Sequence, residues 1–476
     1  MSNEQSVQRG LKTRHLSMIA IGGSIGTGLF IASGGAISEA GPGGALLSYG
    51  IIGVMVFFLM NSLGELATYL PVSGSFSTYA NRFVDPAFGF ALGWNYWLNW
   101  AITLAVDIST TAIIMQYWFP HVPGWIFSAI FMALIFLLNL LSVETFGEAE
   151  FWFSTIKVIT VICFIGVGLL TIFGVMGGNF VGMHNFHTGD APFVGGMPAI
   201  LGACVIAGFS FQGVEMVGIS AGESENPEKS IPKAVKQIFW RILLFYICSI
   251  LVIGLLIPYT SPNLLGKEVS DVTTSPFTLV FKRAGLAAAA SVMNAVILTS
   301  VLSAVNSGLY AGTRMLYALA CNDQAPKIFK RVNKKGIPFF ALLATTIVGG
   351  LAFITSILGP QIYSLLVASS GLTGFIAWLG IAVCHVRFRQ AFVKQGHDLG
   401  ELPYKAKWYP FGPCLASVIC LIVILLQDTQ AIHNHDYGSL LLTYLSVPIF
   451  ILLFIYYKIR YKTKLIPLEE VNLNRE

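Results

Sequence analysis

Long runs of apolar residues follow one another along the whole chain. Twelve of them approach or exceed the length of about 20 residues that a helix needs to cross the hydrocarbon core of a bilayer. They lie near residues 16–40, 44–69, 87–118, 124–142, 149–175, 197–222, 238–259, 286–320, 339–358, 360–386, 411–427 and 438–457. The pattern predicts an all-α membrane protein with twelve transmembrane helices.

Two of these runs are broken near their centres by glycine-rich sequences. The first run is interrupted at residues 22–28 and the sixth at residues 208–213. Each glycine costs a helix about 1 kcal/mol relative to alanine, and unwound backbone at membrane depth is tolerated only where it is buried in protein or lines a cavity. Paired breaks in corresponding spans indicate two related halves with a binding site between them.

Composition restricts the classes of function that remain. The 476 residues are 55% hydrophobic and only 11% charged, whereas about a quarter of a soluble domain is charged. The seven cysteines occur singly, without the spacing of a zinc site or a disulfide framework. The histidines lie mainly in loops or near span ends, and no Ser/His/Asp set shares one face. We therefore expect no enzyme, cofactor or metal ion.

Basic residues lie mostly on one side of the predicted membrane. If the N-terminus is cytoplasmic, 23 of the 28 lysines and arginines fall in inner loops and tails, and the outer segment 174–196 contains none. Such asymmetry is typical of cytoplasmic loops. The net charge of +5 therefore reflects topology, and we expect no nucleic-acid partner. A cleaved signal peptide is disfavoured because the first run is long and glycine-rich at its centre.

The two breaks supply groups that suit an α-amino acid. A half-helix that begins after residues 22–28 presents free N–H groups and its positive dipole end to a carboxylate. Carbonyl groups released where the first half-helix ends, and others near the second break, can accept hydrogen bonds from an ammonium. The candidate substrate-binding residues at the breaks are Ala20, Ile21, Ser24, Ile25, Gly26, Thr27, Gly28, Phe209, Ser210 and Phe211.

Four ionisable residues stand out among those inside the predicted spans, where a charge costs about 2.5–3.5 kcal/mol on insertion scales. Glu65 is close to the inner end of its span, so we expect a structural cap or snorkelling group. Asp107 and Glu215 are substrate-binding candidates that could partner a cationic side chain. Glu215 follows the second break, so it could instead carry a proton or cap a helix. The fourth is Lys157 in the fifth span.

Two further polar segments have open interpretations. In the eighth span Thr299, Ser303 and Asn306 share one helical face. Hydrogen bonding between helices and ligand binding both explain such a stripe, and Ser303 is a substrate-binding candidate. The inner loop 223–233 is expected to be a turn with solvated charges, leading into an interfacial helix that ends near Arg241.

Several long blocks of sequence carry a resemblance to a known family. They are residues 91–97, 208–213, 221–225, 275–281 and 374–380. In these blocks the chain resembles bacterial amino acid permeases of the amino acid, polyamine and organocation superfamily, and among them those specific for lysine. The resemblance implies a secondary transporter that imports an L-amino acid, L-lysine above others, by proton symport through alternating access.

The resemblance also implies an architecture. It is the LeuT-type fold, with spans 1 and 6 broken and the substrate held between them. Five spans in residues 16–175 are repeated in inverted orientation in residues 197–386, and two peripheral spans occupy residues 411–457. Tails 1–15 and 458–476 would lie in the cytoplasm of a bacterium, with the spans in its inner membrane.

For Lys157 the resemblance implies a coupling role. In proton-coupled members of this fold a lysine at the matching position replaces the sodium ion that bridges spans 1 and 8 in sodium-coupled members. Lys157 would then donate to carbonyls near Gly22 and Gly23 and to the hydroxyl of Ser300 or Ser303, and would release and rebind a proton. A permanently charged structural strut is the alternative.

Lysine selectivity and transport mode stay open at this stage. Permeases for neutral or aromatic substrates resemble the chain and carry acids at the positions of Asp107 and Glu215, so these acids do not establish selectivity. An amino acid or polyamine exchanger, or a membrane sensor that binds lysine and signals, would share the same features. A regulatory membrane partner cannot be deduced from the sequence.

Overall fold

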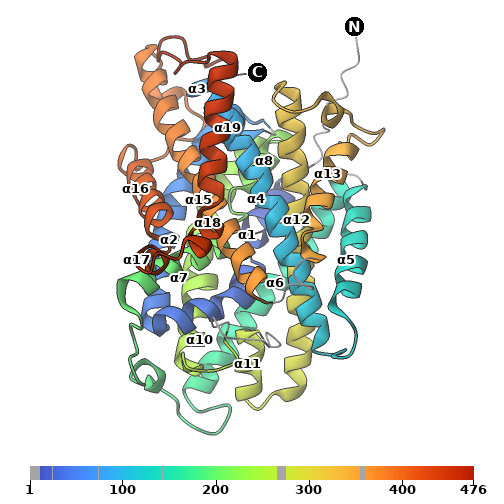
Figure 1. Cartoon of the computed structure of the whole chain (residues 1–476), viewed down its shortest axis with the longest axis vertical. Coiled ribbons are helices and arrows are strands. Elements are labelled where there is room, and N and C mark those ends of the chain that lie inside the picture. Colours follow the sequence, from blue (N-terminus) through green and yellow to red (C-terminus); the bar gives the residue numbers. More distant parts are fainter. Residues whose placement is uncertain are drawn as a thin grey trace.

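Long helices lie side by side and make up most of the molecule (Figure 1). The computed structural model describes residues 11–23, 25–72, 74–141, 143–264, 275–353 and 360–475. Within these ranges the only β pairing is an isolated bridge between Leu11 and Ser224. The predicted all-α class is confirmed.

The helices of the first half of the chain follow the predicted runs, except for a short helix at residues 75–83 that lies between two of them. They are α1 (Thr13–Gly22), the π-helical turn η1 (Gly28–Ala32), α2 (Ser33–Tyr69), α3 (Ser75–Phe83), α4 (Pro86–Gln116), α5 (Gly124–Asn139) and α6 (Val143–Ile172). Within α2, Gly41 has a φ of 75° and Pro42 follows it. Because glycine adopts positive φ at little cost, the helix kinks there, between the first two predicted spans.

The remaining helices continue the pattern to the C-terminus. They are η2 (His184–Phe186), α7 (Gly196–Phe211), α8 (Met216–Ser220), η3 (Ala221–Glu223), α9 (Pro227–Arg241), η4 (Ile242–Ile247), α10 (Cys248–Leu256), α11 (Pro276–Arg283), α12 (Ala287–Cys321), η5 (Lys327–Lys330), α13 (Phe339–Gly349), α15 (Pro360–Lys394), η6 (Leu399–Glu401), α16 (Phe411–Leu426), α17 (Thr429–His433), α18 (Tyr437–Tyr444) and α19 (Ser446–Tyr461).

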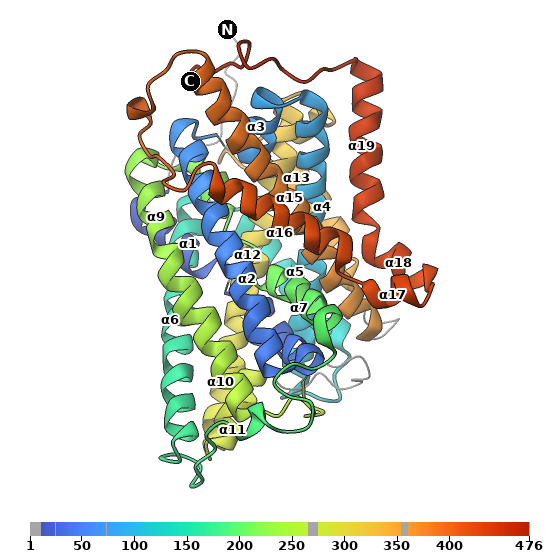
Figure 2. The same cartoon turned by 90° about the vertical axis from the view of Figure 1, so that its left-hand side faces the viewer.

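Seven helical stretches in the described part of the chain are long and apolar enough to cross a membrane. They are Gly28–Tyr69, Pro86–Gln116, Glu144–Ile172, Gly196–Glu223, Pro227–Leu256, Ser291–Cys321 and Leu365–Lys394. The helices α5, α13 and α16 are apolar but shorter. In Figure 2, α6 and α19 lie at opposite edges of the bundle. Large apolar side chains on these edge helices are exposed, among them Trp152, Ile162 and Ile459, as expected of a surface that faces lipid.

Both glycine-rich breaks are present, and the second lies later than predicted. Helix α1 ends at Gly22 and helical structure resumes at Gly28. Helix α7, however, continues through Phe211, so the break falls at residues 212–215. A Cβ at Gly208 would lie 2.4 Å from the ring of Phe375, so Gly208 permits close helix packing. Gly213, with a φ of 94°, makes the turn.

Candidate functional site

A small cavity lies where the break after α1 meets α4, α7 and α12. Its volume is about 20 Å³, which is room for roughly one water molecule. An amino acid can therefore occupy this place only if the surrounding elements move apart. The residues that line the cavity are Gly23, Gly26, Thr27, Gly28, Trp100, Thr103, Asp107, Phe209, Gln212 and Ala304.

Five of the predicted substrate-binding residues line this cavity. They are Gly26, Thr27, Gly28, Asp107 and Phe209. Ile25 is fully buried in the core and Ser210 binds Tyr49 through a hydrogen bond of 2.7 Å. Phe211 stacks on Tyr246. Ser24 lies outside the described residues, as do the side chains of Ala20 and Ile21, whose backbone belongs to α1.

The glycines of the first break allow the two broken segments to pack closely. A Cβ at Gly28 would lie 2.3 Å from the Cα of Ser210 on α7, and one at Gly26 would lie 2.8 Å from the Cβ of Ala304 on α12. Such distances leave no room for a side chain. The break therefore serves both the cavity wall and the contact between η1 and α7.

Asp107 contributes the one formal charge among the described residues that line the cavity. It lies on α4, is 2% exposed, and its carboxyl group is next to the hydroxyl of Thr27. It also interacts electrostatically with Lys157. A carboxylate in such a site attracts a cationic group of a ligand, because a charge buried there needs a partner.

Two cavity residues that the sequence analysis missed, Thr103 and Gln212, join a polar network. Thr103 Oγ1 donates to Gln212 Oε1 at 3.3 Å and lies 2.6 Å from Ser370 Oγ. Gln212 Nε2 donates to the carbonyl of Ser370 at 2.6 Å. The network ties α4 and the second break to α15. Spacing offered a signal for Thr103, which precedes Asp107 by one turn of the same helix.

Glu215 lies at the N-terminus of α8, but it is not among the residues that line the cavity. Its carboxylate accepts hydrogen bonds from Tyr96 Oη at 2.9 Å, Trp378 Nε1 at 3.1 Å and the backbone N–H of Gly213 at 3.3 Å. The three donors come from α4, α15 and the second break. These hydrogen bonds therefore hold the carboxylate in place and join the N-terminus of α8 to α4 and α15.

Lys157 is fully buried and reaches the end of α1. Its Nζ donates to the carbonyl oxygen of Gly22 at 2.9 Å, which is one of the contacts that the resemblance implied. The hydroxyl groups of Ser300 and Ser303, which the resemblance implied as partners of Lys157, are hydrogen-bonded to other residues. Ser300 donates to Val296 of its own helix, and Ser303 donates to Glu150 Oε1 at 2.6 Å and is not among the residues that line the cavity.

Comparison with known proteins decides the family. The family model described as amino acid permease matches residues 15–468. The chain belongs to the amino acid permease family. Membership of this family, together with the apolar helices, identifies the chain as a multi-pass membrane protein. The family indicates a transporter of amino acids rather than an enzyme.

Three relatives of this permease are similar over nearly their whole length. The chain is 58% identical over 477 residues to a histidine permease of Lactococcus lactis, with 100% of both chains covered. It is 58% identical over 457 residues to a lysine-specific permease of Escherichia coli, covering 95% of this chain and 94% of the relative. A lysine-specific permease of Lactococcus lactis is 56% identical over 480 residues, with 100% of this chain and 94% of the relative covered.

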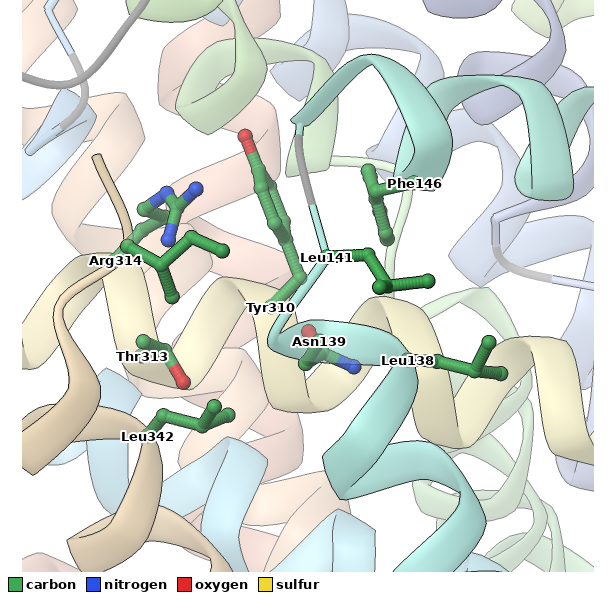
Figure 3. A pocket seen from close by; sticks show the side chains of 9 residues that line it. Leu138, Asn139, Leu141, Phe146, Tyr310, Thr313, Arg314 and Leu342 are labelled. Carbon is green, nitrogen blue, oxygen red and sulfur yellow. The ribbon is translucent and has the colours of Figure 1, made fainter. Parts of the chain in front are cut away.

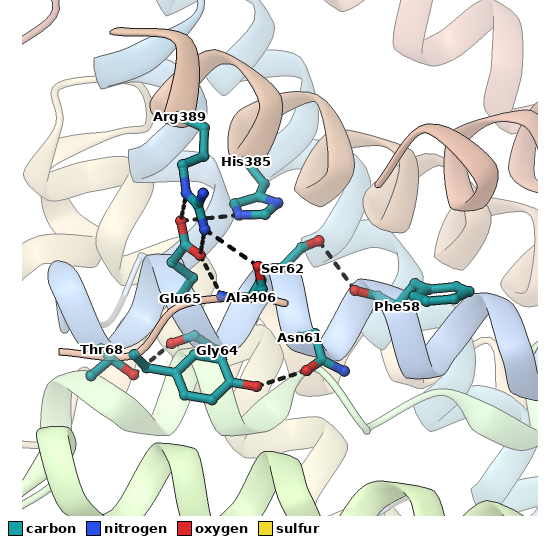
Figure 4. Close-up of polar contacts among 10 residues, drawn as sticks. Phe58, Asn61, Ser62, Gly64, Glu65, Thr68, His385, Arg389 and Ala406 are labelled. Atoms are coloured by element: carbon teal, nitrogen blue, oxygen red, sulfur yellow. Dashed lines mark hydrogen bonds and ion pairs between the residues drawn. The ribbon is translucent and has the colours of Figure 1, made fainter. Parts of the chain in front are cut away.

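Glu65 of the permease belongs to a buried ion pair that joins two helices. It is neither a helix cap nor a snorkelling group. Figure 4 shows its carboxylate on α2 facing Arg389 and His385 on α15. Arg389 donates to both carboxylate oxygens, His385 Nε2 lies 3.2 Å from Oε1, and the N–H of Ala406 donates at 2.7 Å. The side chain is fully buried, so these partners offset its lost hydration.

The first residue of the inner loop 223–233 is buried, whereas the sequence predicts solvated charges along this loop. Glu223 is fully buried and accepts hydrogen bonds from Arg314 Nε and Tyr310 Oη of α12. The expectation was wrong because a partner 91 residues away cannot be read from a short charged segment. Arg314, which lies within the predicted span 286–320, is thereby paired.

A second cavity beside Arg314 is a packing junction. Figure 3 shows Tyr310, Thr313 and Arg314 on one wall, with side chains of the segment that ends α5, of α6 and of α13 around them. Its volume is about 10 Å³, at the lower limit for one water molecule. The rings of Phe146 and Tyr310 stack with centroids 4.3 Å apart. Nearby, Asn139 donates to Asn306 at 2.8 Å, so this part of the α12 stripe joins helices.

Proposed function

We propose that this permease imports L-lysine together with protons by alternating access. The observation that carries the proposal is that the first break and Asp107 line the same cavity. The first N–H groups of a helix lack intrahelical acceptors and favour an anion, so the backbone of residues 25–28 suits the substrate carboxylate. Asp107 suits an ammonium group.

We propose the LeuT-type architecture for the whole chain. Support comes from the two broken elements, which contact each other where Gly28 meets Ser210. The kink at Gly41 divides the stretch Gly28–Tyr69 into two spans, and the shorter apolar helices supply others. Residues 16–175 and 197–386 form the two inverted repeats, and residues 411–457 add two peripheral spans.

Lysine is the proposed substrate because two of the relatives are lysine-specific permeases. A third is a histidine permease, so lysine and histidine both belong in a competition test. The carboxylate site makes a separate prediction with cadaverine, the decarboxylated form of lysine. Cadaverine should compete much more weakly than lysine, and equal competition would remove the proposed carboxylate site.

Coupling to protons is assigned to Lys157. Its ammonium joins α6 to the end of α1 through the Gly22 carbonyl, so movement of the broken span changes the surroundings of the charge. Loss of that acceptor favours release of a proton, because an unpartnered buried charge is costly. Sodium has no role in this scheme.

Uptake by purified protein in liposomes tests the proposal. Radiolabelled lysine should accumulate when an inward proton gradient is imposed, without sodium. In Lys157→Ala, gradient-driven accumulation should be lost while substrate binding or exchange remains. Uptake that ignores the gradient but needs lysine or a polyamine inside would indicate an exchanger, and binding without flux would indicate a sensor. A sodium requirement would overturn the coupling scheme.

A further inference from the structure

Glu150 is a fully buried acid on α6 that the cavity does not use. It precedes Lys157 by two turns of the same helix, and its Oε1 lies 3.9 Å from Lys157 Nζ. Oε1 also accepts the hydrogen bond of 2.6 Å from Ser303 on α12. The other oxygen, Oε2, is buried and has no hydrogen-bond partner among the described residues.

Such an oxygen has lone pairs available, and a buried polar atom favours a hydrogen-bond partner. A carboxylate with one oxygen held and the other open is arranged to accept a proton. The lysine beside it has an ammonium whose other acceptor, the Gly22 carbonyl, belongs to the broken span. When that span moves, Glu150 stays on the same helix as Lys157 and remains within reach.

We propose that Glu150 accepts the proton that Lys157 releases during transport. This inference rests on the proposed coupling role of Lys157. In the step, an N–H bond of the ammonium breaks, its electron pair stays on nitrogen, and an O–H bond forms at Glu150. Amine and carboxylic acid are then both neutral, and water on the cytoplasmic side later takes the proton from Glu150.

The surroundings favour this exchange. Two opposite charges in an apolar interior carry a large desolvation cost, and the transfer removes both charges at once. Transfer requires approach to about 2.6–3.2 Å or one bridging water, so rotation of the flexible lysine side chain must shorten the 3.9 Å gap. Ser303 positions the carboxylate by holding Oε1.

Two other acids, Asp107 and Glu148, lie near the pair. Asp107 on α4 interacts with Lys157 from the cavity side. Glu148, on α6, binds Arg14 and lies 3.1 Å from His15 Nε2 on α1. Glu148 is partly exposed, so it offers a matched control: an acid of the same helix, two residues from Glu150, outside the proposed relay.

The test compares Glu150→Gln with Glu148→Gln in liposomes. We expect Glu150→Gln to bind lysine and exchange it within about threefold of the wild type, while gradient-driven accumulation falls about 100-fold, the lower range for a positioned proton-transfer group. Its uptake should also lose the pH dependence of the wild type. Glu148→Gln should keep all three properties. Normal accumulation in Glu150→Gln, or equal loss of binding and accumulation, would overturn the inference.

Two additional measurements keep the test decisive. If Glu150→Gln does not fold, Glu150→Asp retains the charge but withdraws the carboxylate by one methylene, and it should show the same selective loss. Infrared difference spectra of the wild type should contain a carboxylic-acid band that a shift in pH alters. Glu148→Gln should retain this band. Absence of the band from the wild type contradicts the transfer. If the wild type itself ignores the proton gradient, the proposed function fails; if only Glu150 proves dispensable, that function stands and this inference fails.

Discussion

At the scale of single residues, Asp107 and Glu215 have different surroundings despite their equal charge. Asp107 lines the cavity, whereas Glu215 is bound by three donors outside it. The two acids are therefore expected to respond differently to neutralisation, and the difference assigns the partner of the substrate ammonium.

Asp107→Asn should weaken lysine binding by about 30-fold or more, because loss of one partner of a buried charge pair costs about 2 kcal/mol at least. Equilibrium binding of radiolabelled lysine to the purified permease measures the effect. Glu215→Gln is the matched control and should keep its affinity within about threefold. If Glu215→Gln alone lost affinity, the ammonium would belong to Glu215.

At the scale of elements, the contact between η1 and α7 depends on the absence of a side chain at Gly28. In Gly28→Ala the new Cβ would lie 2.3 Å from the Cα of Ser210, so the two broken segments must separate. Such overpacking costs about 1–3 kcal/mol. We expect slower lysine uptake and weaker binding, measured side by side in liposomes and in detergent.

Gly50→Ala in α2 is the control for Gly28→Ala. Among the described residues, no atom outside the adjoining helix backbone lies within 4 Å of a Cβ at Gly50, and alanine improves helix propensity by about 1 kcal/mol. Its uptake should match the wild type. Wild-type uptake in Gly28→Ala as well would show that the close contact is dispensable for transport.

The ion pair of Glu65 and Arg389 joins α2 to α15. Arg389→Gln leaves a buried carboxylate without its main partner, which costs about 3–5 kcal/mol. We therefore expect a clearly lower unfolding temperature in a detergent thermostability assay. Lys394→Gln, which breaks an exposed pair with Glu469, should change stability by no more than about 1 kcal/mol. Equal stability of both variants would mean that the buried pair contributes nothing.

At the scale of the whole molecule, the two ends of the bundle carry different loops. Figure 2 shows the loop after α6 at one end and the segment after α19 at the other. Basic residues are absent from the segment 174–196 and frequent after α19. The positive-inside rule therefore predicts that the loop after α6 lies outside the cell.

Cysteine labelling of intact cells tests this orientation. In a variant without native cysteines, Asp190→Cys in the loop after α6 should react with an impermeant maleimide. Lys335→Cys, before α13, should react only after the membrane is opened. Both positions are exposed, so accessibility alone does not separate them. The reverse pattern would place the termini outside.

The sequence alone determined the features that depend on short stretches of chain. Apolar runs predicted the helices, and the glycines at residues 22–28 predicted the break after α1, because helix propensity and hydrophobicity act locally. Asp107 was recognised as a candidate because an acid is costly anywhere inside a span. The resemblance added the contact between Lys157 and the carbonyl of Gly22.

Only the tertiary structure decided which distant groups meet. Glu65 pairs with Arg389, which is 324 residues away in the sequence. Glu150 accepts a hydrogen bond from Ser303, which is 153 residues away. The position of the second break was also decided by packing, since Gly208 remains helical against Phe375. In each case the partner lies on another helix, and local sequence does not encode which helix faces which. Burial then makes the pairing necessary, because a buried charge or polar group without a partner is costly.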